Sequence, residues 1–216
     1  TCALPIFAGA SKGEGLGNKF LSHIRETDAI AEVVRCFEDE NITHVSGSVD
    51  PLRDIDIINT ELCLADLETT QKRADRLNKI AKSGDKAAKA ELAVLEKVLT
   101  CLENGEGARK AQLTKDELPL LKELNLLTLK PILYICNVAE DEAATATENP
   151  LVQKVTEFAA AEGSQVVAVS AKIESEIAEL PDDEAAMFLE ELGLPEAGLT
   201  KLIHASYALL GLINFF

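Results

Sequence analysis

The sequence of 216 residues lacks the features of disulfide-rich, zinc-binding and membrane-spanning proteins. Its five cysteines are odd in number and widely spaced, without a C-x-x-C pair, so neither a disulfide framework nor a zinc site is expected. No run of about 18 apolar residues could span a bilayer, and no basic region followed by an apolar one marks a signal peptide. These absences predict a cytoplasmic protein with reduced, mostly buried thiols.

Basic residues are scarce as well. Lysine and arginine number 21 against 37 acidic residues, which gives a net charge of -16. Such a charge argues against general attraction to DNA or to anionic membranes, so contact with nucleic acid would have to be local. Hydrophobic residues make up 47% of the chain, which is enough to fill the core of one large domain or two small ones.

Apolar strands alternate with helices in much of the chain. Residues 31–37 (AEVVRCF) are short and β-branched, which predicts a strand covered on both faces. Residues 129–137 (LKPILYICN) and 164–171 (SQVVAVSA) predict two more buried strands, and residues 149–163 predict a helix that a proline opens and a glycine closes. This order predicts an α/β fold, a parallel sheet with helices on both faces.

A long helical segment interrupts this alternation. Residues 52 to about 103 contain one glycine and no proline, and their apolar residues recur in steps of three and four, as at Leu62 and Leu95. The sequence KSGDK (82–86) would join two helices into an antiparallel hairpin inserted in the α/β domain. The predicted division is a nucleotide-binding domain at 1–54 and 128–216, with a helical coiled-coil insertion at 55–127.

Polar residues follow two of the predicted strands. Because ligands of parallel sheets bind beyond the carboxyl ends of the strands, the sequences NVAE and SAKIE are candidate binding loops. They are similar to the base-binding loops of P-loop GTPases, N-K-x-D and S-A-K; the second match is complete, while the first lacks the lysine and the aspartate. Capping of the next turn is the alternative role. The candidate residues are Asn137, Val138, Glu140, Ser170, Ala171 and Lys172.

The two departures bear on the choice of base. An aspartate in place of Glu140 would accept hydrogen bonds from the ring N–H and the amine of guanine, and adenine lacks both donors. Glu140 displaces the carboxylate by one methylene, and Val138 removes a lysine stem that would cover one face of the base. Selection of guanine should be weak, and adenine is the expected base.

A glycine-rich segment, GASKGEGLGNKFLSHIRETDAI, lies at residues 9–30. It is not a phosphate-binding P-loop, because no G-x-x-x-x-G-K-[ST] sequence is present anywhere. Its glycines would let it rearrange when a terminal phosphate arrives or leaves, and a connection without such a role is the alternative. The candidate switch glycines are Gly9, Gly13, Gly15 and Gly17.

The chain resembles the YchF family, the Obg-like ATPases, from about Ala8 to Phe216. The resemblance is carried by this glycine-rich segment and by VVRCFED, ITHVSGSVDPLRDIDIINTEL, LTLKPILYICNVAE and ALLGLINFF. It implies a nucleotide-binding domain of the translation-factor class of P-loop NTPases with an inserted coiled-coil hairpin. It also implies ATP and Mg²⁺ as cofactors, hydrolysis of ATP in preference to GTP, and association with ribosomal RNA and protein.

The resemblance also assigns roles to single residues. The family's N-x-x-E loop maps onto Asn137 and Glu140, and its switch loop maps onto residues 9–17. Ile6 falls where Ras-like enzymes carry a water-positioning glutamine, so His44 is the candidate catalytic residue that would orient water. A surface position in a polar loop is the alternative for this histidine.

Two parts of the family pattern are expected outside the chain, the P-loop strand with the metal ligands and a TGS domain. Cys2 and Pro5 stand where the family has a magnesium-sensing aspartate and a glycine whose N–H meets the γ-phosphate, which proline cannot supply. Residues 1–6 are therefore expected to be non-native. Without a P-loop the chain alone is expected to be inactive.

The end of the hairpin is basic in an otherwise acidic chain. Residues 71–90 carry seven basic and two acidic side chains, a balance of +5, so the remainder carries -21. A basic tip suits salt-sensitive contact with ribosomal RNA, and a solvated helix face is the alternative. The basic residues are Lys72, Arg73, Arg76, Lys79, Lys82, Lys86 and Lys89.

Two other functions remain open on the sequence. The chain could be a non-catalytic binding module that docks a partner through the hairpin, with vestigial strand-end loops. It could also belong to a guanine-specific GTPase. A P-loop in the upstream coding sequence would argue against the first, and a comparison of ATP with GTP binding would test the second.

Overall fold

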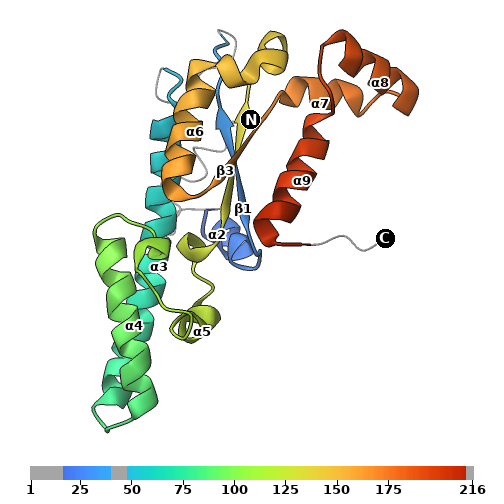
Figure 1. Cartoon of the computed structure of the whole chain (residues 1–216). Coiled ribbons are helices and arrows are strands. Elements are labelled where there is room, and N and C mark those ends of the chain that lie inside the picture. Colours follow the sequence, from blue (N-terminus) through green and yellow to red (C-terminus); the bar gives the residue numbers. More distant parts are fainter. Residues whose placement is uncertain (1–16, 40–47, 213–216) are drawn as a thin grey trace. The chain divides into compact units, whose positions relative to one another are not determined.

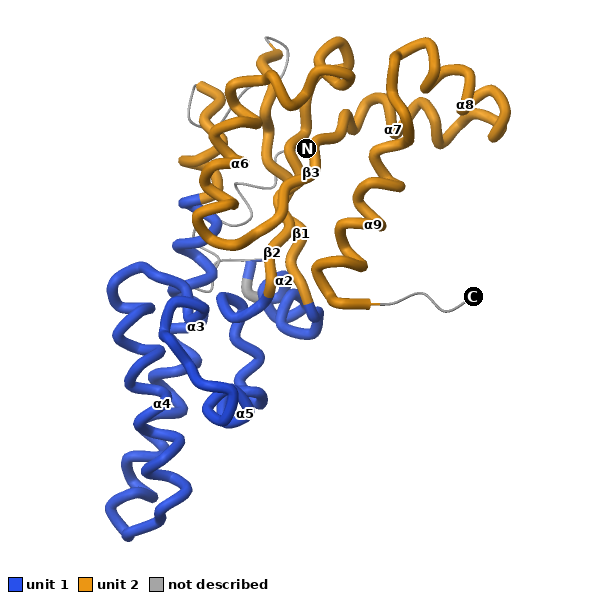
Figure 2. The backbone as a smooth tube through the Cα atoms, in the orientation of Figure 1, with its two compact units in different colours: residues 1–28, 56–130 blue, residues 29–55, 131–216 orange. Residues whose placement is uncertain are grey.

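The computed structural model describes residues 17–39 and 48–212. The chain divides into two compact units (Figure 2). Unit 1 comprises residues 1–28 and 56–130, and unit 2 comprises residues 29–55 and 131–216. The predicted domain boundaries are not tested by this division and stay a prediction.

Unit 2 contains a parallel sheet of three strands in the order β1, β2, β3 (Figure 1). The strands are β1 (Ile30–Arg35), β2 (Ile132–Asn137) and β3 (Gln165–Val169). All three end at the same level, because Arg35, Asn137 and Val169 are partners in the register. The predicted α/β fold with a parallel sheet is confirmed.

One face of the sheet packs against α6 (Pro150–Glu162). Tyr134 and Cys136, at alternate positions of β2, are fully buried in one cluster with Val155 and Ala159 of α6. The helix begins after a capping asparagine and ends at Gly163, whose φ of 72° suits glycine best. The predicted proline-to-glycine helix is therefore confirmed.

The opposite face of the sheet carries α9 (Gly198–Leu210), which mainly contacts β3 and β2 (Figure 1). Val166 and Ala168 pack with the α6 cluster, so Val167 and Val169 face the other way. There, Val169 meets the start of α9 at Gly198. Helices thus lie on both faces of the sheet. Unit 2 also contains η5 (Glu140–Glu148), α7 (Ala171–Ile177) and α8 (Asp182–Glu191).

The prediction that the strand at 31–37 is covered on both faces is wrong. Val34 and Cys36 are buried, whereas Val33, which points to the other face, is 65% exposed. The physical reason is that α9 lies mainly over β3 and β2 and leaves this face of β1 open. An apolar run in an outer strand of the described sheet, such as β1, therefore does not require helices on both of its faces.

The helical hairpin is formed by α3 (Pro51–Ala81) and α4 (Lys86–Glu103), of which residues 56–103 belong to unit 1 (Figures 1 and 2). The turn passes through Gly84, with φ of 95°, and Asp85 accepts a hydrogen bond from the backbone N–H of Ala88 to cap α4. Leu77, Leu95 and other apolar residues form the core. The predicted hairpin is confirmed.

Unit 1 also contains α2 (Gly17–Arg25), η2 (Ala108–Lys110), α5 (Leu118–Leu121), η3 (Lys122–Leu124) and η4 (Leu127–Leu129).

A fully buried carboxylate, Asp66, joins α3 to the segment that returns from the hairpin. It accepts hydrogen bonds from the backbone N–H groups of Leu127 (3.0 Å) and Thr128 (2.8 Å) and from the Thr128 hydroxyl (2.8 Å). The guanidinium of Arg25, from α2, pairs with it at 3.0 Å. One side chain therefore connects α2, α3 and η4 within unit 1.

The four cysteines in the described part of the chain are free thiols, and three of them, Cys36, Cys63 and Cys136, are buried. The hydrogen bond with Cys136 and burial both raise the pKa of Cys36, so this thiol stays protonated. The prediction of reduced, mostly buried thiols is confirmed for these residues. Across residues 17–39 and 48–212, no helix combines the length and the apolar character that crossing a membrane requires.

Candidate nucleotide-binding site

Two strand-end loops meet where β2 and β3 finish. Asn137 and Val169 are register partners, so the loops that follow them begin side by side. The side-chain Oδ1 of Asn137 accepts a hydrogen bond from the backbone N–H of Ala171 at 2.9 Å. The structure thus brings together the two loops that the sequence predicts to bind a base.

This hydrogen bond also defines what Asn137 can offer a ligand. Since Oδ1 is the acceptor for Ala171, the Nδ2 group remains as the donor end of the amide. A ring nitrogen of a purine needs such a donor. Asn137 is partly buried at the end of its strand, and it lies at the level where parallel sheets bind ligands.

The carboxylate of Glu140 is paired with the ammonium of Lys172, which donates a hydrogen bond to Oε2. Glu140 begins η5, after β2, and Lys172 lies in the first turn of α7, after β3. Both side chains reach solvent, with 33% and 66% of their surface exposed. The hydrogen bond to Glu140 raises the pKa of Lys172, so the lysine stays charged at neutral pH.

Val138 lies in the core of unit 2. It is 3% exposed and belongs to the same buried cluster as Cys36 and Val152. Its backbone N–H donates to the carbonyl of Val169 at 2.9 Å, which extends the ladder beyond the two strands. Its predicted place beside a base is untested, and its apolar character is explained by burial alone.

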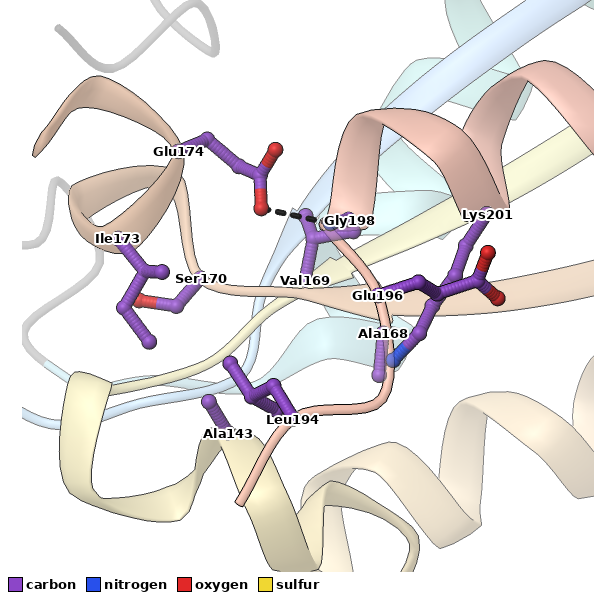
Figure 3. A pocket seen from close by; sticks show the side chains of 10 residues that line it. All are labelled: Ala143, Ala168, Val169, Ser170, Ile173, Glu174, Leu194, Glu196, Gly198 and Lys201. Carbon is purple, nitrogen blue, oxygen red and sulfur yellow. Dashed lines mark hydrogen bonds between the residues drawn. The ribbon is translucent and has the colours of Figure 1, made fainter. Parts of the chain in front are cut away.

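Ser170 is buried at the end of β3, and its hydroxyl has no hydrogen-bond partner among the residues that the structure describes. It lines a small pocket together with residues of η5, β3, α7, α9 and the segment before α9, including Glu174 of α7 and Lys201 of α9 (Figure 3). A buried hydroxyl without a partner is a place where water or a ligand atom can bind. This property agrees with a position at the rim of a binding site.

Glu174 links the second loop to α9. Its carboxylate accepts a hydrogen bond from the backbone N–H of Gly198 at 2.7 Å (Figure 3). It accepts a second one from the N–H of Leu199 at 2.9 Å, also in the first turn of α9. A carboxylate there satisfies two donors that the helix itself cannot. A Cβ atom on Gly198 would lie 2.8 Å from Cγ1 of Val169, so only glycine fits. The sequence reasoning missed this contact, because 24 residues separate the partners and no local pattern marks them.

Several predicted residues lie outside the described residues, so their roles stay predictions. They are the switch glycines Gly9, Gly13 and Gly15, the catalytic candidate His44, and the N-terminal positions Cys2, Pro5 and Ile6. Gly17 is described: it is buried and begins α2.

The basic residues of the hairpin divide into two groups. Lys72 pairs with Glu68, and Arg73 pairs with Glu91 at 2.6 Å. The other five are exposed and form no ion pair within the described part of the chain. These five, called the basic tip below, are Arg76, Lys79, Lys82, Lys86 and Lys89.

The described residues do not fit a magnesium site. Among residues 17–39 and 48–212, no three histidine, cysteine, aspartate or glutamate side chains are grouped so that they could hold a metal ion. Carboxylates of the site are already engaged, Glu140 by Lys172 and Glu174 by the start of α9. No step of a reaction is therefore assigned to a metal held by these residues.

Comparison with known proteins gives close relatives. No family model matches the chain. Proteins called "ribosome-binding ATPase YchF" match over 211 residues, 98% of this chain, in Bacillus subtilis and Haemophilus influenzae (both 57% identical) and in Escherichia coli O157:H7 (55%). The chain spans 57% to 58% of the length of these relatives.

A solved structure is similar as well. The YchF GTPase of Schizosaccharomyces pombe matches with a TM-score of 0.79 and 34% identity, over 94% of this chain and 57% of that one. The parallel sheet, its helical layers and this likeness define an α/β protein of the P-loop NTPase class. Within that class the chain belongs with the YchF proteins, to which it is homologous over nearly its whole length. The resemblance predicted from the sequence motifs is confirmed.

Proposed function

We propose that this chain forms the base-binding part of the nucleotide domain, together with the helical hairpin, of a cytoplasmic ATPase that associates with ribosomes. The observation that carries the proposal is the 2.9 Å hydrogen bond from the Ala171 N–H to Asn137 Oδ1, which holds the two strand-end loops together. The names of the bacterial relatives support the ribosome and ATP as partners.

The chain's own residues have distinct proposed roles toward the base. Asn137 donates from Nδ2 to a ring nitrogen, and the Ala171 hydrogen bond fixes the orientation of its amide. The Ser170 hydroxyl is available to a water or to a polar atom of the base. Glu140 and Lys172 border the same loops and set the charge beside the base.

The chemistry at the phosphates is proposed to depend on groups other than these. When bound, Mg²⁺ would neutralise phosphate charge, and the described residues do not fit it. His44 would position water, and the segment from Gly9 to Gly17 would sense the terminal phosphate. The chain contains no G-x-x-x-x-G-K-[ST] sequence, so the chain alone is proposed not to turn over nucleotide.

The choice of nucleotide gives the test of this function. We expect the full-length protein that includes this chain to bind ATP at least about tenfold more tightly than GTP, a difference of about 1.4 kcal/mol. Titration with each unlabelled nucleotide against a fluorescent ATP analogue measures both affinities. Asn137→Ala should weaken the binding of both nucleotides, because it removes the Nδ2 donor that either purine would use. Gln153→Ala, on the exposed side of α6, should weaken the binding of neither nucleotide.

A guanine-specific GTPase is the second candidate, because the solved relative from Schizosaccharomyces pombe is described as a GTPase. The same titration separates the two functions. GTP binding as tight as ATP binding, or tighter, would establish the second candidate and remove the first.

The basic tip is proposed to contact ribosomal RNA. We expect replacement of Arg76, Lys79 and Lys82 with glutamine to make ribosome binding less sensitive to salt. The negative slope of log affinity against log salt should become shallower by about 2 to 3, because about 0.7 to 0.9 counterions are released for each phosphate contact. Co-sedimentation with purified ribosomes at several salt concentrations measures this slope. The control variant removes three exposed charges elsewhere, at Lys115, Lys122 and Lys154. Equal losses in both variants would mean that the tip contributes only to net charge.

A further inference from the structure

We propose that Lys172 is a residue that determines base specificity, because it occupies the carboxylate that guanine would need. The inference rests on the proposed function, in which the loops at Asn137 and Ser170 bind the base. In this arrangement Lys172 holds Glu140 in an ion pair across the two loops and so favours adenine over guanine.

The geometry sets this pair beside the base-binding groups. Glu140 follows Asn137 by three positions, and Lys172 directly follows Ala171. The Asn137–Ala171 hydrogen bond and the Glu140–Lys172 ion pair therefore bridge the same two loops, and they do so next to each other. A base that accepts a hydrogen bond from Nδ2 of Asn137 would therefore lie beside the Glu140–Lys172 ion pair.

The competition concerns the acceptor capacity of Glu140. Guanine presents two adjacent donors, the ring N–H and the exocyclic amine, which a carboxylate receives as two parallel hydrogen bonds. The Lys172 ammonium already donates to Oε2 and neutralises the charge that would strengthen those bonds. Adenine lacks this pair of donors, so the ion pair between Glu140 and Lys172 does not lower the affinity for adenine.

The exposure of the pair limits the size of the effect. With 66% of the lysine side chain and 33% of the glutamate side chain exposed, water screens the interaction. A guanine base can therefore compete for Glu140, at a cost in affinity of up to about fivefold. The ion pair biases the choice of base, and the loops alone do not exclude guanine.

The test is the Lys172→Met variant of the full-length protein, which keeps the aliphatic length of the side chain and removes the charge. We expect the ratio of GTP to ATP affinity, measured by displacement of a fluorescent ATP analogue, to rise about two- to fivefold. Lys172→Arg retains the positive charge and should keep the wild-type ratio. Lys154→Met, at an exposed position of α6, is the matched control and should leave both affinities unchanged.

A double variant separates the ion pair from other effects. In a Glu140→Gln background the carboxylate is absent, so Lys172→Met should no longer change the ratio. An unchanged ratio in the single variant, with ATP binding intact, would overturn the role of Lys172 and leave the proposed function standing. An equal loss of both affinities would reduce the pair to a structural contact and also overturn it. If the wild-type protein binds neither nucleotide, the proposed function and this inference both fail.

Discussion

Replacing Asp66 with alanine is expected to lower the free energy of unfolding by about 3 to 5 kcal/mol, the range for breaking a buried pair by removing one partner. The carboxylate is fully buried and receives four hydrogen bonds, three of them from Leu127 and Thr128. Without it, two backbone N–H groups and one hydroxyl lose their acceptor inside unit 1, and Arg25 loses its ion-pair partner.

Urea denaturation followed by circular dichroism measures this loss, since α3 and α4 contribute much of the helical signal. Glu68→Ala is the matched control on the same helix. Glu68 forms an exposed ion pair with Lys72, so its removal should cost at most about 1 kcal/mol. Similar losses for both variants would show that the buried network contributes no more than a surface pair.

Asp66→Asn tests whether charge or shape matters. The asparagine keeps one acceptor of similar size but replaces the second oxygen with a donor group. That donor would face the N–H and hydroxyl of Thr128, which both donate to Oδ2 of Asp66. We therefore expect a destabilisation of similar order to that of alanine, and a fully stable variant would contradict the assignment of these contacts.

Local sequence patterns were sufficient for most elements of the fold. The helix from Pro150 to Glu162 follows from a proline at its start and a glycine after its end, and both act within a single turn. Strand β2 follows from an unbroken apolar run, and the hairpin follows from leucine spacing, since Leu62 and Leu95 are both buried as the seams predict. Each of these signals depends on residues close in the sequence.

Contacts between distant residues could not be predicted in the same way. Asp66 and Thr128 are 62 positions apart, and nothing in either neighbourhood identifies the other. The open face of β1 likewise depends on where α9 lies, which is a property of the packed unit. The apolar character of Val33 does not indicate that, among the described residues, no helix covers its face of the sheet.

In the candidate site, too, one contact can be predicted from the strand topology and another cannot. The contact between Asn137 and Ala171 follows from the parallel topology. Neighbouring parallel strands have their carboxyl ends at the same end of the sheet, so the loops after β2 and β3 begin side by side. The pairing of Glu140 with Lys172 does not follow from topology, because the two residues are 32 positions apart and neither motif indicates a partner for its charge. Only the folded chain shows that Glu140 of one loop pairs with Lys172 of the other.

Asn149→Ala is expected to lower the free energy of unfolding by about 2 to 4 kcal/mol, because this residue both caps α6 and fills a buried polar junction. Its Oδ1 accepts hydrogen bonds from the N–H groups of Leu151 (2.8 Å) and Val152 (3.3 Å). Its Nδ2 donates to the carbonyl of Cys36 (3.0 Å) and to Glu142 (2.9 Å). The alanine variant loses the cap and leaves a buried carbonyl without its donor.

The control is Asp85→Ala, which removes an exposed cap with a single hydrogen bond to the N–H of Ala88 at 2.8 Å. That loss should be about 1 kcal/mol when measured by the same urea titration. Asn149→Asp separates the two roles of Asn149: the carboxylate still caps α6, but it cannot donate to Cys36 and it repels Glu142. We expect Asn149→Asp to remain clearly less stable than the wild type. A wild-type stability would mean that the cap alone matters, and that the end of β1 is held to α6 by apolar packing without help from this amide.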